Sequence, residues 1–465
     1  MKKIHFIGIG GIGMSALADI LIAGGKSVTG SDLRPNSITD KLKDKGAVIY
    51  KGHSGDNLTG EIDLVVKTSC IRDNNPEIEK AREKGVPIIT RGELLKSIME
   101  EAGTSVAVTG THGKTTTSAL IAHILEACGK DPTFAIGGEI GKAANARSGK
   151  SGIMVAEVDE SDGFFRNIGS TCAAITNIER EHMEHYGNME NLIDAYKEFI
   201  GRISPEGALF YNGEDALLSG MVKGSSARAF SFGIDGSFDV GCEELQHAKN
   251  IEFELVFSRS RSGRVKSSLI GRHNAMNLLA AIGICSQIGV APDDIIKAIS
   301  SFSGVGRRFD RVAKIGDVEV VEDYAHHPTE LFSVIHAARD YSDGRTVVVF
   351  QPHRHSRTAD LAEDFMTCFN EADVLILTDV YSADEDRAEG AGVRDIFENM
   401  NKKSFELVDL VEKDRVPERV SSIVRGNDVI LILGAGDIRD VSGELVERIK
   451  KKRIRGRTLR HGAQG

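Results

Sequence analysis

Proline, cysteine and long apolar segments are all scarce in this chain of 465 residues. Only 9 residues are proline, whereas 50 are glycine and 41% are hydrophobic, a composition that excludes disordered and collagen-like chains. The 6 cysteines lie far apart without a CxxC pair. This spacing favours isolated thiols in a reducing compartment over a disulfide framework or a zinc site, so we expect a cytoplasmic protein.

No segment of about 18 uncharged apolar residues is present, so the sequence predicts no membrane span. The N-terminus has two lysines before an apolar run, as a signal peptide does. His5, Asp19 and a series of glycines interrupt that run, and we therefore reject the signal peptide.

Basic residues are fewer than acidic ones, at 58 against 68, which gives a formal net charge of -10. A chain whose whole surface holds nucleic acid has the opposite balance, so we expect no nucleic-acid partner. Eight basic residues and no acidic ones follow from Arg448 onward, which leaves 50 minus 68, or -18, for the rest. We interpret this tail as a solvated helix end, with contact to anionic surfaces as the alternative. No heptad pattern indicates an oligomeric state.

Strand patterns alternate with helical segments along the chain. Residues 3–9 form a strand pattern before helical spacing at 14–23, and residues 105–109 precede a second glycine-bearing turn and helix. A third series of strands is expected at residues 346–351, 373–380 and 428–436. Such alternation predicts mostly parallel sheets with helices on both faces.

The first glycine-rich turn joins the opening strand to its helix. Gly8, Gly10 and Gly13 form a GxGxxG pattern, and Asp32 ends the next predicted strand, where an acid can bind a ribose hydroxyl. Glycines let the backbone approach an anion, and the helix N-terminus supplies N–H donors. We therefore expect Gly8, Gly10, Gly11, Gly13 and Asp32 to bind a pyrophosphate, such as that of a UDP-sugar, with a ligand-free tight turn as the alternative.

The second turn, GTHGKTTT, has the pattern of a phosphate loop with a shortened front, because Val108 stands where the standard pattern has glycine. Lys114 can reach terminal phosphates, and the Thr115 hydroxyl can reach Mg2+. A nucleoside triphosphate is expected at the loop residues Gly110, Thr111, His112, Gly113, Lys114, Thr115 and Thr116.

Acidic residues follow the next predicted strand. Glu157, Asp159, Glu160 and Asp162 come directly after residues 153–156. Mg2+ is usually bound by one or two carboxylates with phosphates and waters, so only some of these acids are expected to be ligands. A solvated acidic turn is the alternative.

His182 lies in the segment NIEREHMEHYGN, after a further predicted strand, together with Glu179, Glu181 and His185. A lone histidine is more often structural than a ligand. Open parallel sheets nevertheless place ligands beyond the carboxyl ends of their strands, so His182 is a candidate ligand.

Two residue pairs later in the chain have open roles. Asn274 and Asn277 lie one helical turn apart, where amides can read a purine edge, cap a helix or form buried hydrogen bonds. Arg307 and Arg308 can reach a transferring phosphate or form a surface salt bridge.

Histidines and arginines follow two predicted strands of the last third, in DYAHHPTE and QPHRHSRT. Arg354 and Arg357 interleave with His353 and His355. Because cations repel a metal and pair well with a carboxylate, we predict a carboxylate-binding site here and disfavour zinc.

The length fits about three domains at roughly 150 residues each. We expect an α/β protein of three domains, each built around a mostly parallel sheet with flanking helices. They are a Rossmann-like N-terminal domain (1–101), a central P-loop ATPase domain (102–311) and a Rossmann-like C-terminal domain with the basic tail (312–465). Residues 203–270 predict a small antiparallel addition to the middle domain.

The chain resembles the Mur ligases from Gly8 to Asp437. The resemblance rests on motifs that occur in the order of that family: GTHGKTTT, AEVDESD, TNIEREHM, GRHNAMN, GVGRRFD, DYAHHPTE, QPHRHSRT and GAGDI. The first motif is shared with folylpolyglutamate synthetases, whereas DESD, HHPTE and QPHR point to the alanine-adding member. The resemblance implies an ATP- and Mg2+-dependent ligase that joins L-alanine to the lactoyl carboxylate of UDP-N-acetylmuramate through an acyl phosphate.

The resemblance also implies roles for individual residues. Lys114 would hold the terminal phosphates and Arg308 the γ-phosphate, while Thr115 and Glu157 bind one Mg2+ and Glu157 with His182 a second. The adenine side is assigned to His273, Asn274 and Asn277, and the nucleotide is contacted from the last domain by Asp323. The amino acid site is assigned to Tyr324, His326, Arg354 and Arg357. Catalytic roles are expected for Lys114, Glu157, His182, Arg308 and His326.

Some positions depart from the family pattern. Glu181 stands where aspartate is usual, Ala325 where glycine is usual, and GFF follows DESD where a small hydroxyl residue is usual. Sister ligases carry a carbamylated lysine at the position of Lys197, but we favour an exposed helix lysine there.

Three other functions stay open as alternatives. They are a sister ligase that reattaches a recycled tripeptide, an NAD-dependent oxidoreductase suggested by the GxGxxG turn with Asp32, and a non-catalytic nucleotide-binding module. The choice among alanine, glycine and serine depends on differences too small for the sequence to decide.

Overall fold

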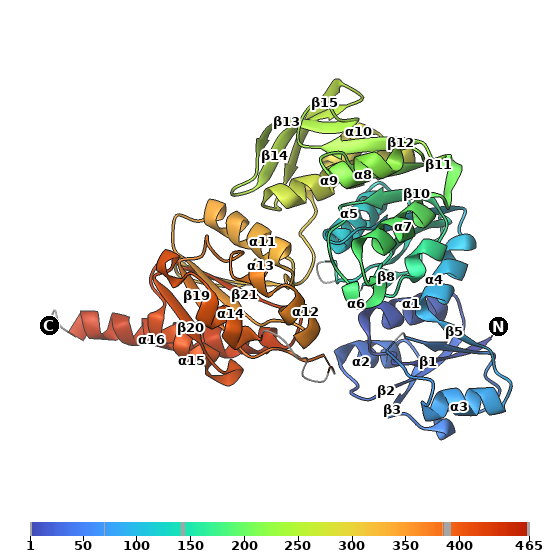
Figure 1. The fold of residues 1–465 in the computed structure, drawn as a ribbon, viewed down its shortest axis with the longest axis horizontal. Coiled ribbons are helices and arrows are strands. Elements are labelled where there is room, and N and C mark those ends of the chain that lie inside the picture. Colours follow the sequence, from blue (N-terminus) through green and yellow to red (C-terminus); the bar gives the residue numbers. More distant parts are fainter. Residues whose placement is uncertain (1, 69, 141–144, 384, 386–391, 463–465) are drawn as a thin grey trace. The chain divides into compact units, whose positions relative to one another are not determined.

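The computed structural model describes residues 2–68, 70–140, 145–383, 385 and 392–462. Across these residues the chain forms three sheets (Figure 1), and its contacts divide it into two compact units. The first unit comprises Met1–Leu245, Glu252–Ser267 and Asn274–Val305, and the second comprises Gln246–Ile251, Ser268–His273 and Gly306–Gly465. Within the described part, no helix has both the length and the apolar character needed to cross a bilayer. All 6 cysteines are free thiols, as their spacing predicts.

The N-terminal sheet has five parallel strands in the order β3-β2-β1-β4-β5. Its strands are β1 (Lys3–Ile7), β2 (Ser27–Asp32), β3 (Val48–Lys51), β4 (Leu64–Lys67) and β5 (Ile88–Thr90). Its helices are α1 (Ile12–Ala23), α2 (Ser37–Asp44), η1 (Gly55–Asn57), α3 (Pro76–Glu83) and α4 (Arg91–Glu100). Ile4 and Phe6 share a core with α1, α2 and α4, while Ile7 and Val65 share another with α3 (Figure 1), so helices cover both faces as predicted.

The middle sheet has ten strands in the order β15-β14-β13-β12-β11-β10-β6-β9-β7-β8. They are β6 (Thr104–Thr109), β7 (Thr133–Ala135), β8 (Ala146–Arg147), β9 (Ile153–Glu157), β10 (Ser170–Ile175), β11 (Ile203–Asn212), β12 (Ala229–Gly233), β13 (Val240–Gln246), β14 (Ile251–Phe257) and β15 (Ser260–Ser267). Its helices are α5 (Lys114–Ala127), η2 (Phe164–Asn167), α6 (Met183–Tyr186), α7 (Met189–Ile200), α8 (Ala216–Val222), α9 (Arg272–Gln287) and α10 (Pro292–Ser300).

The expectation of an antiparallel addition over residues 203–270 is wrong for β11 and β12. Both pair in parallel with their neighbours, because the chain returns through α8 between them and so enters β12 in the same direction. The connections from β13 to β14 and from β14 to β15 are short, as is usual between antiparallel neighbours, so the expected addition is limited to these three strands.

The C-terminal sheet has six strands in the order β16-β17-β21-β18-β19-β20, all parallel except the β16–β17 pair. They are β16 (Asp310–Ile315), β17 (Val318–Asp323), β18 (Thr346–Phe350), β19 (Val374–Leu377), β20 (Leu407–Leu410) and β21 (Val429–Leu433). Its helices are α11 (Pro328–Tyr341), α12 (His355–Asp360), α13 (Ala362–Phe365), α14 (Val393–Asn399), η3 (Lys402–Ser404), η4 (Lys413–Arg415), α15 (Val416–Ile423), η5 (Ile438–Asp440) and α16 (Val441–Gly462). The three strands predicted here are confirmed, and each is shorter than its pattern.

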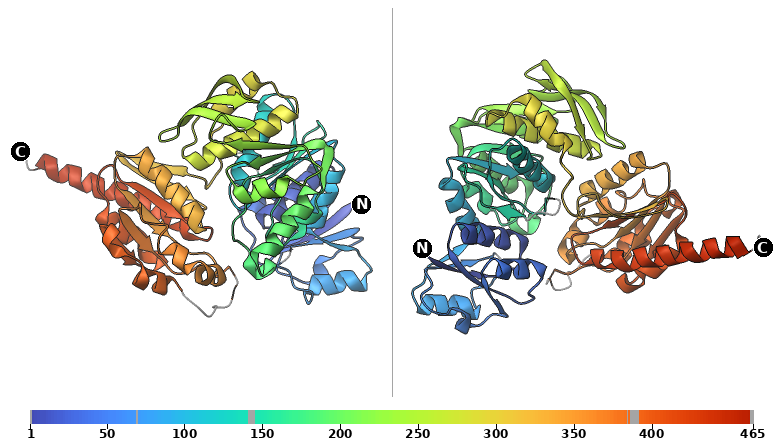
Figure 2. Two further views of the ribbon diagram at one scale, coloured as in Figure 1. Left: turned by 45° about the horizontal axis from the view of Figure 1, so that its top comes forward. Right: turned by 180° about the vertical axis from the view of Figure 1, so that it is seen from behind.

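The basic tail continues α16, which packs beside α15 and β16 and then runs past the sheet (Figure 2). Leu445 and Ile449 are buried in the core, whereas Lys450 to Lys452 are exposed. The prediction of a solvated helix end is therefore confirmed for these lysines.

A buried carboxylate lies in the N-terminal domain. Glu77, on α3, accepts hydrogen bonds from Ser31 Oγ at 2.6 Å and Asn57 Nδ2 at 2.7 Å. His5 Nε2 and His53 Nδ1 lie 3.3 and 2.9 Å from its oxygens. Burial favours the neutral acid, but these partners outweigh burial and lower the pKa of Glu77. The network ties β1, β2 and η1 to α3.

We expect Glu77→Ala to lower the thermal midpoint of the N-terminal domain, because it leaves buried donors unpaired at about 1–3 kcal/mol each. Glu79→Ala, at an exposed position of the same helix, is the matched control and should change the midpoint little.

Because the pKa of Glu77 is lower in the folded state, its stabilisation is present above the unfolded pKa, about 4.3, and is lost as pH falls through the folded pKa. Glu77→Gln removes the ionisable group, so calorimetry at decreasing pH should show the difference in thermal midpoint between this variant and the wild type becoming smaller. A difference that grows on acidification would contradict this account.

Candidate active site

The phosphate-loop turn connects β6 to α5, and close contacts fix its backbone. Gly110 and Gly113 have positive φ angles of 126° and 84°. A Cβ atom at Gly110 would overlap Thr176, and one at Gly113 would overlap the Asn277 amide. Both positions therefore require glycine for conformation and for space.

Asn177 holds this turn from the end of β10. Its backbone oxygen accepts the Thr111 N–H at 3.0 Å, and its side-chain oxygen accepts the His112 N–H at 2.8 Å. Because the Thr117 N–H donates to the Gly113 oxygen, the amides before Thr117 precede the helical hydrogen-bond ladder and can bind phosphate oxygens. Sequence reasoning missed Asn177, although its place just beyond a predicted strand was the available signal.

Lys114 forms a buried ion pair with Glu160. Its Nζ lies 2.8 and 3.0 Å from the two carboxylate oxygens of Glu160 and donates to the Gly110 oxygen at 2.6 Å. Burial opposes the charge on Lys114, but Glu160, Asp159 and Glu157 outweigh it and raise the pKa of the ammonium. The loop therefore holds a permanent cation where terminal phosphates are expected.

Glu157 ends β9 beside the start of α5. It accepts hydrogen bonds from Thr115 Oγ1 at 3.1 Å and from the Gly137 N–H at 2.7 Å. A Cβ atom at Gly137 would overlap the Glu157 carboxylate, so the backbone closely surrounds this side chain. The structure thus brings together the two residues that the resemblance assigns to one Mg2+.

His182 groups with Asp159 and Glu160. One potential ligand atom from each lies within 4.8 Å of the others, and Glu157 is not in this group among the described residues. Burial opposes ionisation of Asp159, but Lys114 and other nearby cations outweigh it and lower its pKa to about 2. Glu157 and His182, to which the resemblance assigns a second Mg2+, are therefore not in one group here, and that assignment stays a prediction.

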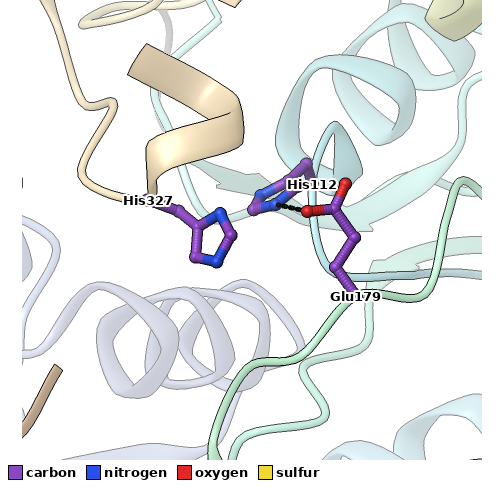
Figure 3. Close-up of side chains that lie close together, drawn as sticks. All are labelled: His112, Glu179 and His327. Carbon is purple, nitrogen blue, oxygen red and sulfur yellow. Dashed lines mark ion pairs between the residues drawn. The ribbon is translucent and has the colours of Figure 1, made fainter. Parts of the chain in front are cut away.

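The far side of the loop carries an ion pair between His112 and Glu179, whose Nε2 and Oε2 atoms are 3.4 Å apart (Figure 3). The Glu179 N–H also donates to Thr111 Oγ1 at 2.8 Å. These contacts connect the loop to the segment that follows β10. His327, also drawn in Figure 3, belongs to the second unit.

Asn274 and Asn277 lie near the start of α9 and are buried. Asn277 Nδ2 donates to Asn274 Oδ1 at 3.1 Å, and Thr117 Oγ1 donates to Asn277 Oδ1 at 3.2 Å. These bonds place α9 against the phosphate-loop helix. His273 belongs to the second unit, where burial and the charge of Arg308 lower its pKa to about 4, so its ring is neutral at pH 7.

In the first glycine turn, Asp32 ends β2 as predicted and shapes the loop. One carboxylate oxygen accepts the Gly10 N–H and the other the Arg34 N–H, each at 2.9 Å. A Cβ atom at Gly10 would lie 2.7 Å from this carboxylate, which explains the glycine. Gly8 has a positive φ of 82°, and Gly11 is the N-cap of α1.

In the second unit, arginines surround Tyr324, which follows β17. The guanidinium carbons of Arg307 and Arg308 lie 4.6 and 5.3 Å from the centre of its ring. Arg307 also donates to the Gly434 oxygen at 2.9 Å, while Arg308 lies 3.6 Å from a Glu330 oxygen. Both arginines therefore contact several groups of the same unit, which is more than the single surface salt bridge considered as the alternative.

Arg354 and Arg357 lie in the same unit as two neighbouring histidines. The rings of His326 and His353 are 6.0 Å apart, and an Arg357 Nη1 donates to His353 Nδ1 at 3.3 Å. Burial, His326 and the arginines lower the pKa of His353 to about 3, so its ring is neutral. Arg354 Nε lies 3.8 Å from a Glu385 oxygen. Two guanidinium groups with a neutral imidazole suit a carboxylate ligand.

Asp323 ends β17 and is buried. It accepts the N–H groups of Phe309 and Ala325 at 2.7 Å each. Burial raises the pKa of Asp323 to about 6 against the opposing charge of Arg308. Ala325 is not among the residues with positive φ, so this backbone accepts alanine where the family usually has glycine.

Lys197 lies on α7 with 56% of its side chain exposed, and its Nζ is 2.9 Å from Asp194. The expectation of an exposed helix lysine is confirmed. Nothing in this environment resembles a buried ligand position.

Comparisons with known proteins agree along the length of the chain. Three family models match: the Mur ligase family catalytic domain at residues 3–102, the Mur ligase middle domain at 108–285 and the Mur ligase glutamate ligase domain at 307–436. A UDP-N-acetylmuramate--L-alanine ligase of Geotalea daltonii is 38% identical over 457 residues, which are 97% of this chain and 99% of the relative. The chain belongs to the Mur ligase family.

Solved structures of Mur ligases share the fold. A UDP-N-acetylmuramate-alanine ligase from Thermotoga maritima has a TM-score of 0.81 and 31% identity, covering 97% of this chain and 100% of that one. A murein peptide ligase from Psychrobacter arcticus has a TM-score of 0.72 at 23% identity and covers 97% and 99% of the two chains, which shows the fold alone. The predicted three-domain α/β architecture is therefore confirmed. The boundaries at 102 and 312 stay predictions, and the second falls inside β16.

In this Mur ligase, we expect Lys114→Met to reduce ADP formation about 100- to 1,000-fold, the range for removing one group that stabilises transition-state charge. Lys197→Met removes an exposed lysine and should leave the rate within about twofold of wild type, as surface changes usually do. Coupled-enzyme assays and thermal melts on both variants separate lost chemistry from lost folding. A Lys114→Met enzyme with near-normal rate would show that the loop does not hold the transferring phosphate.

Proposed function

We propose that this Mur ligase joins L-alanine to the lactoyl carboxylate of UDP-N-acetylmuramate, using ATP and releasing ADP and phosphate. The observation that carries the proposal is the charge arrangement of the phosphate loop: Lys114 is paired with Glu160 at the start of α5, and Thr115 bonds to Glu157 alongside. The 38% identity to a relative of that name over nearly its whole length supports the substrates.

The phosphate loop fits ATP with Mg2+. The first-turn amides of α5 and Lys114 would hold the phosphates, and Thr115 Oγ1 with the Glu157 carboxylate offers the oxygen ligands that Mg2+ prefers. Gly137 leaves just enough space for that carboxylate, since any side chain there would displace it. When bound, Mg2+ supplies charge neutralisation at the phosphate oxygens.

In the first step, an oxygen of the substrate carboxylate attacks the γ-phosphorus of ATP. A new oxygen–phosphorus bond gives the acyl phosphate, and the bond to ADP breaks. Lys114 neutralises charge on the transferring group, and its contacts to Glu160 and the Gly110 oxygen fix its position. Such a transfer needs positioning and charge neutralisation more than covalent help.

In the second step, the alanine amine attacks the acyl carbon, and phosphate leaves from the tetrahedral intermediate. Arg354 and Arg357 would bind the alanine carboxylate, and Tyr324 would border the alanine side chain. His326 Nδ1 lies 3.0 Å from the Tyr324 carbonyl oxygen and 3.3 Å from a Glu330 oxygen, and both oxygens are acceptors, so this nitrogen carries a proton. In the neutral form of the ring, Nε2 is then the basic nitrogen. His326 is thus placed to take the proton of the attacking amine.

The test is an omission assay with purified enzyme. Phosphate release should require UDP-N-acetylmuramate, L-alanine, ATP and Mg2+ together, and mass spectrometry should find the alanyl UDP-sugar. Glycine and serine serve as competing amino acids, and the tripeptide L-alanyl-γ-D-glutamyl-meso-diaminopimelate tests the recycling alternative. Turnover without the UDP-sugar, or equal rates with the tripeptide, would contradict the proposal.

A further inference from the structure

Arg91 is a positively charged residue that belongs neither to the first glycine turn nor to the phosphate loop. It is the first residue of α4 and is half-buried. Within the described part of the chain, its guanidinium makes neither a hydrogen bond nor an ion pair. A cation at the first position of a helix also opposes the helix dipole, so α4 gains no stability from it. Because the charge of Arg91 does not stabilise α4, a role in ligand binding is favoured.

The backbone holds Arg91 close to the first glycine turn. A Cβ atom at Gly13 would lie 3.2 Å from Arg91 Cδ and 3.3 Å from its Nη1. The guanidinium therefore lies beside the first turn of α1, in close contact with Gly13. A pyrophosphate is expected at the N–H groups of that turn, so backbone donors and a charged side chain would border the same ligand.

The start of α4 is also fixed against the acidic segment. Thr90 and Glu93 form a capping box, with the Thr90 N–H 2.7 Å from Glu93 Oε2. A Cβ atom at Gly92 would overlap the ring of Phe164, which follows the DESD acids by two residues. The positive charge of Arg91 acts on Asp159 and favours its ionised form. Arg91 thus lies near the first glycine turn, and its charge reaches the acidic residues of the phosphate-loop site.

We propose that Arg91 binds an oxyanion of the UDP-sugar and orients that substrate toward the phosphate loop. The proposal rests on the proposed function, because it assumes that the GxGxxG turn holds a UDP-sugar. The guanidinium has five N–H donors in a planar fork, which pairs with phosphate or carboxylate in two-bond geometry. Two groups of the substrate share this chemistry, namely the pyrophosphate and the lactoyl carboxylate, and the experiment separates them.

The test measures equilibrium binding by calorimetry on the full chain without ATP. The ligands are UDP-N-acetylmuramate, UDP-N-acetylglucosamine, which lacks the lactoyl carboxylate, and uridine, which lacks both anions. The variants are Arg91→Met, Arg91→Lys and the matched control Lys96→Met, a partly exposed position on the same helix that pairs with Glu100. Thermal melts accompany each variant.

Arg91→Met should raise the Kd for UDP-N-acetylmuramate by at least about tenfold, the effect of losing a charged hydrogen bond, with uridine binding unchanged. Arg91→Lys should recover part of the loss, and Lys96→Met should bind as wild type does. Equal weakening of both UDP-sugars assigns Arg91 to the pyrophosphate, whereas weakening of UDP-N-acetylmuramate alone assigns it to the carboxylate.

Binding of UDP-N-acetylmuramate by Arg91→Met within twofold of wild type would overturn the proposal, and so would an equal loss of uridine binding, which indicates a structural role. If the wild-type chain itself fails to bind UDP-N-acetylmuramate, the proposed function fails as well. If the wild type binds and turns over UDP-N-acetylmuramate and Arg91→Met binds it equally well, the proposed function holds and only the role of Arg91 is contradicted.

Discussion

The buried ion pair between Lys114 and Glu160 is the interaction on which the phosphate-loop site depends. In a site of low dielectric constant, an unpaired ammonium would be costly, and its carboxylate partner offsets that cost. The pair also fixes the Nζ atom, which bonds the Gly110 oxygen inside the loop. An incoming phosphate must therefore compete with Glu160 for Lys114, so nucleotide binding is expected to rearrange Glu160 together with its neighbours Asp159 and His182.

Local charges explain how an acidic chain can bind several anionic ligands. Without its basic tail the chain carries 50 basic and 68 acidic residues, so its overall field repels phosphates. Anion binding therefore falls to groups that act at short range: helix N-termini, Lys114, and the guanidinium groups of Arg354 and Arg357. Burial and the neighbouring cations keep His353 neutral, so its Nδ1 can accept the hydrogen bond that Arg357 donates.

Sequence reasoning predicted the parts of the site that adjacent residues specify. The GTHGKTTT and GxGxxG turns lie at strand-to-helix junctions as expected, because the glycine positions and the flanking apolar periods are local features. Asp32 likewise ends its strand and meets the first turn. The alternation of strands and helices was predicted from the same apolar periodicity, and the family motifs then indicated the three-domain architecture of the Mur ligases.

The remaining features depend on residues far apart in the chain. Glu160 meets Lys114 across 46 positions, and Asn177 reaches His112 across 65. The grouping of His182 with Asp159 and Glu160 depends on the positions of β9 and β10, which lie on opposite sides of β6 in the sheet. The parallel pairing of β11 and β12 was missed because strand direction depends on the connection and not on the strand residues.

The central claim is that the first bond formed joins an oxygen of the substrate carboxylate to the γ-phosphorus of ATP. Transfer of isotope from the carboxylate tests it most directly. UDP-N-acetylmuramate labelled with oxygen-18 in the lactoyl carboxylate is turned over with L-alanine and ATP, and the products are analysed by mass spectrometry. The account predicts one labelled oxygen in the released inorganic phosphate and none in ADP. Unlabelled phosphate, or label found in AMP, would contradict it.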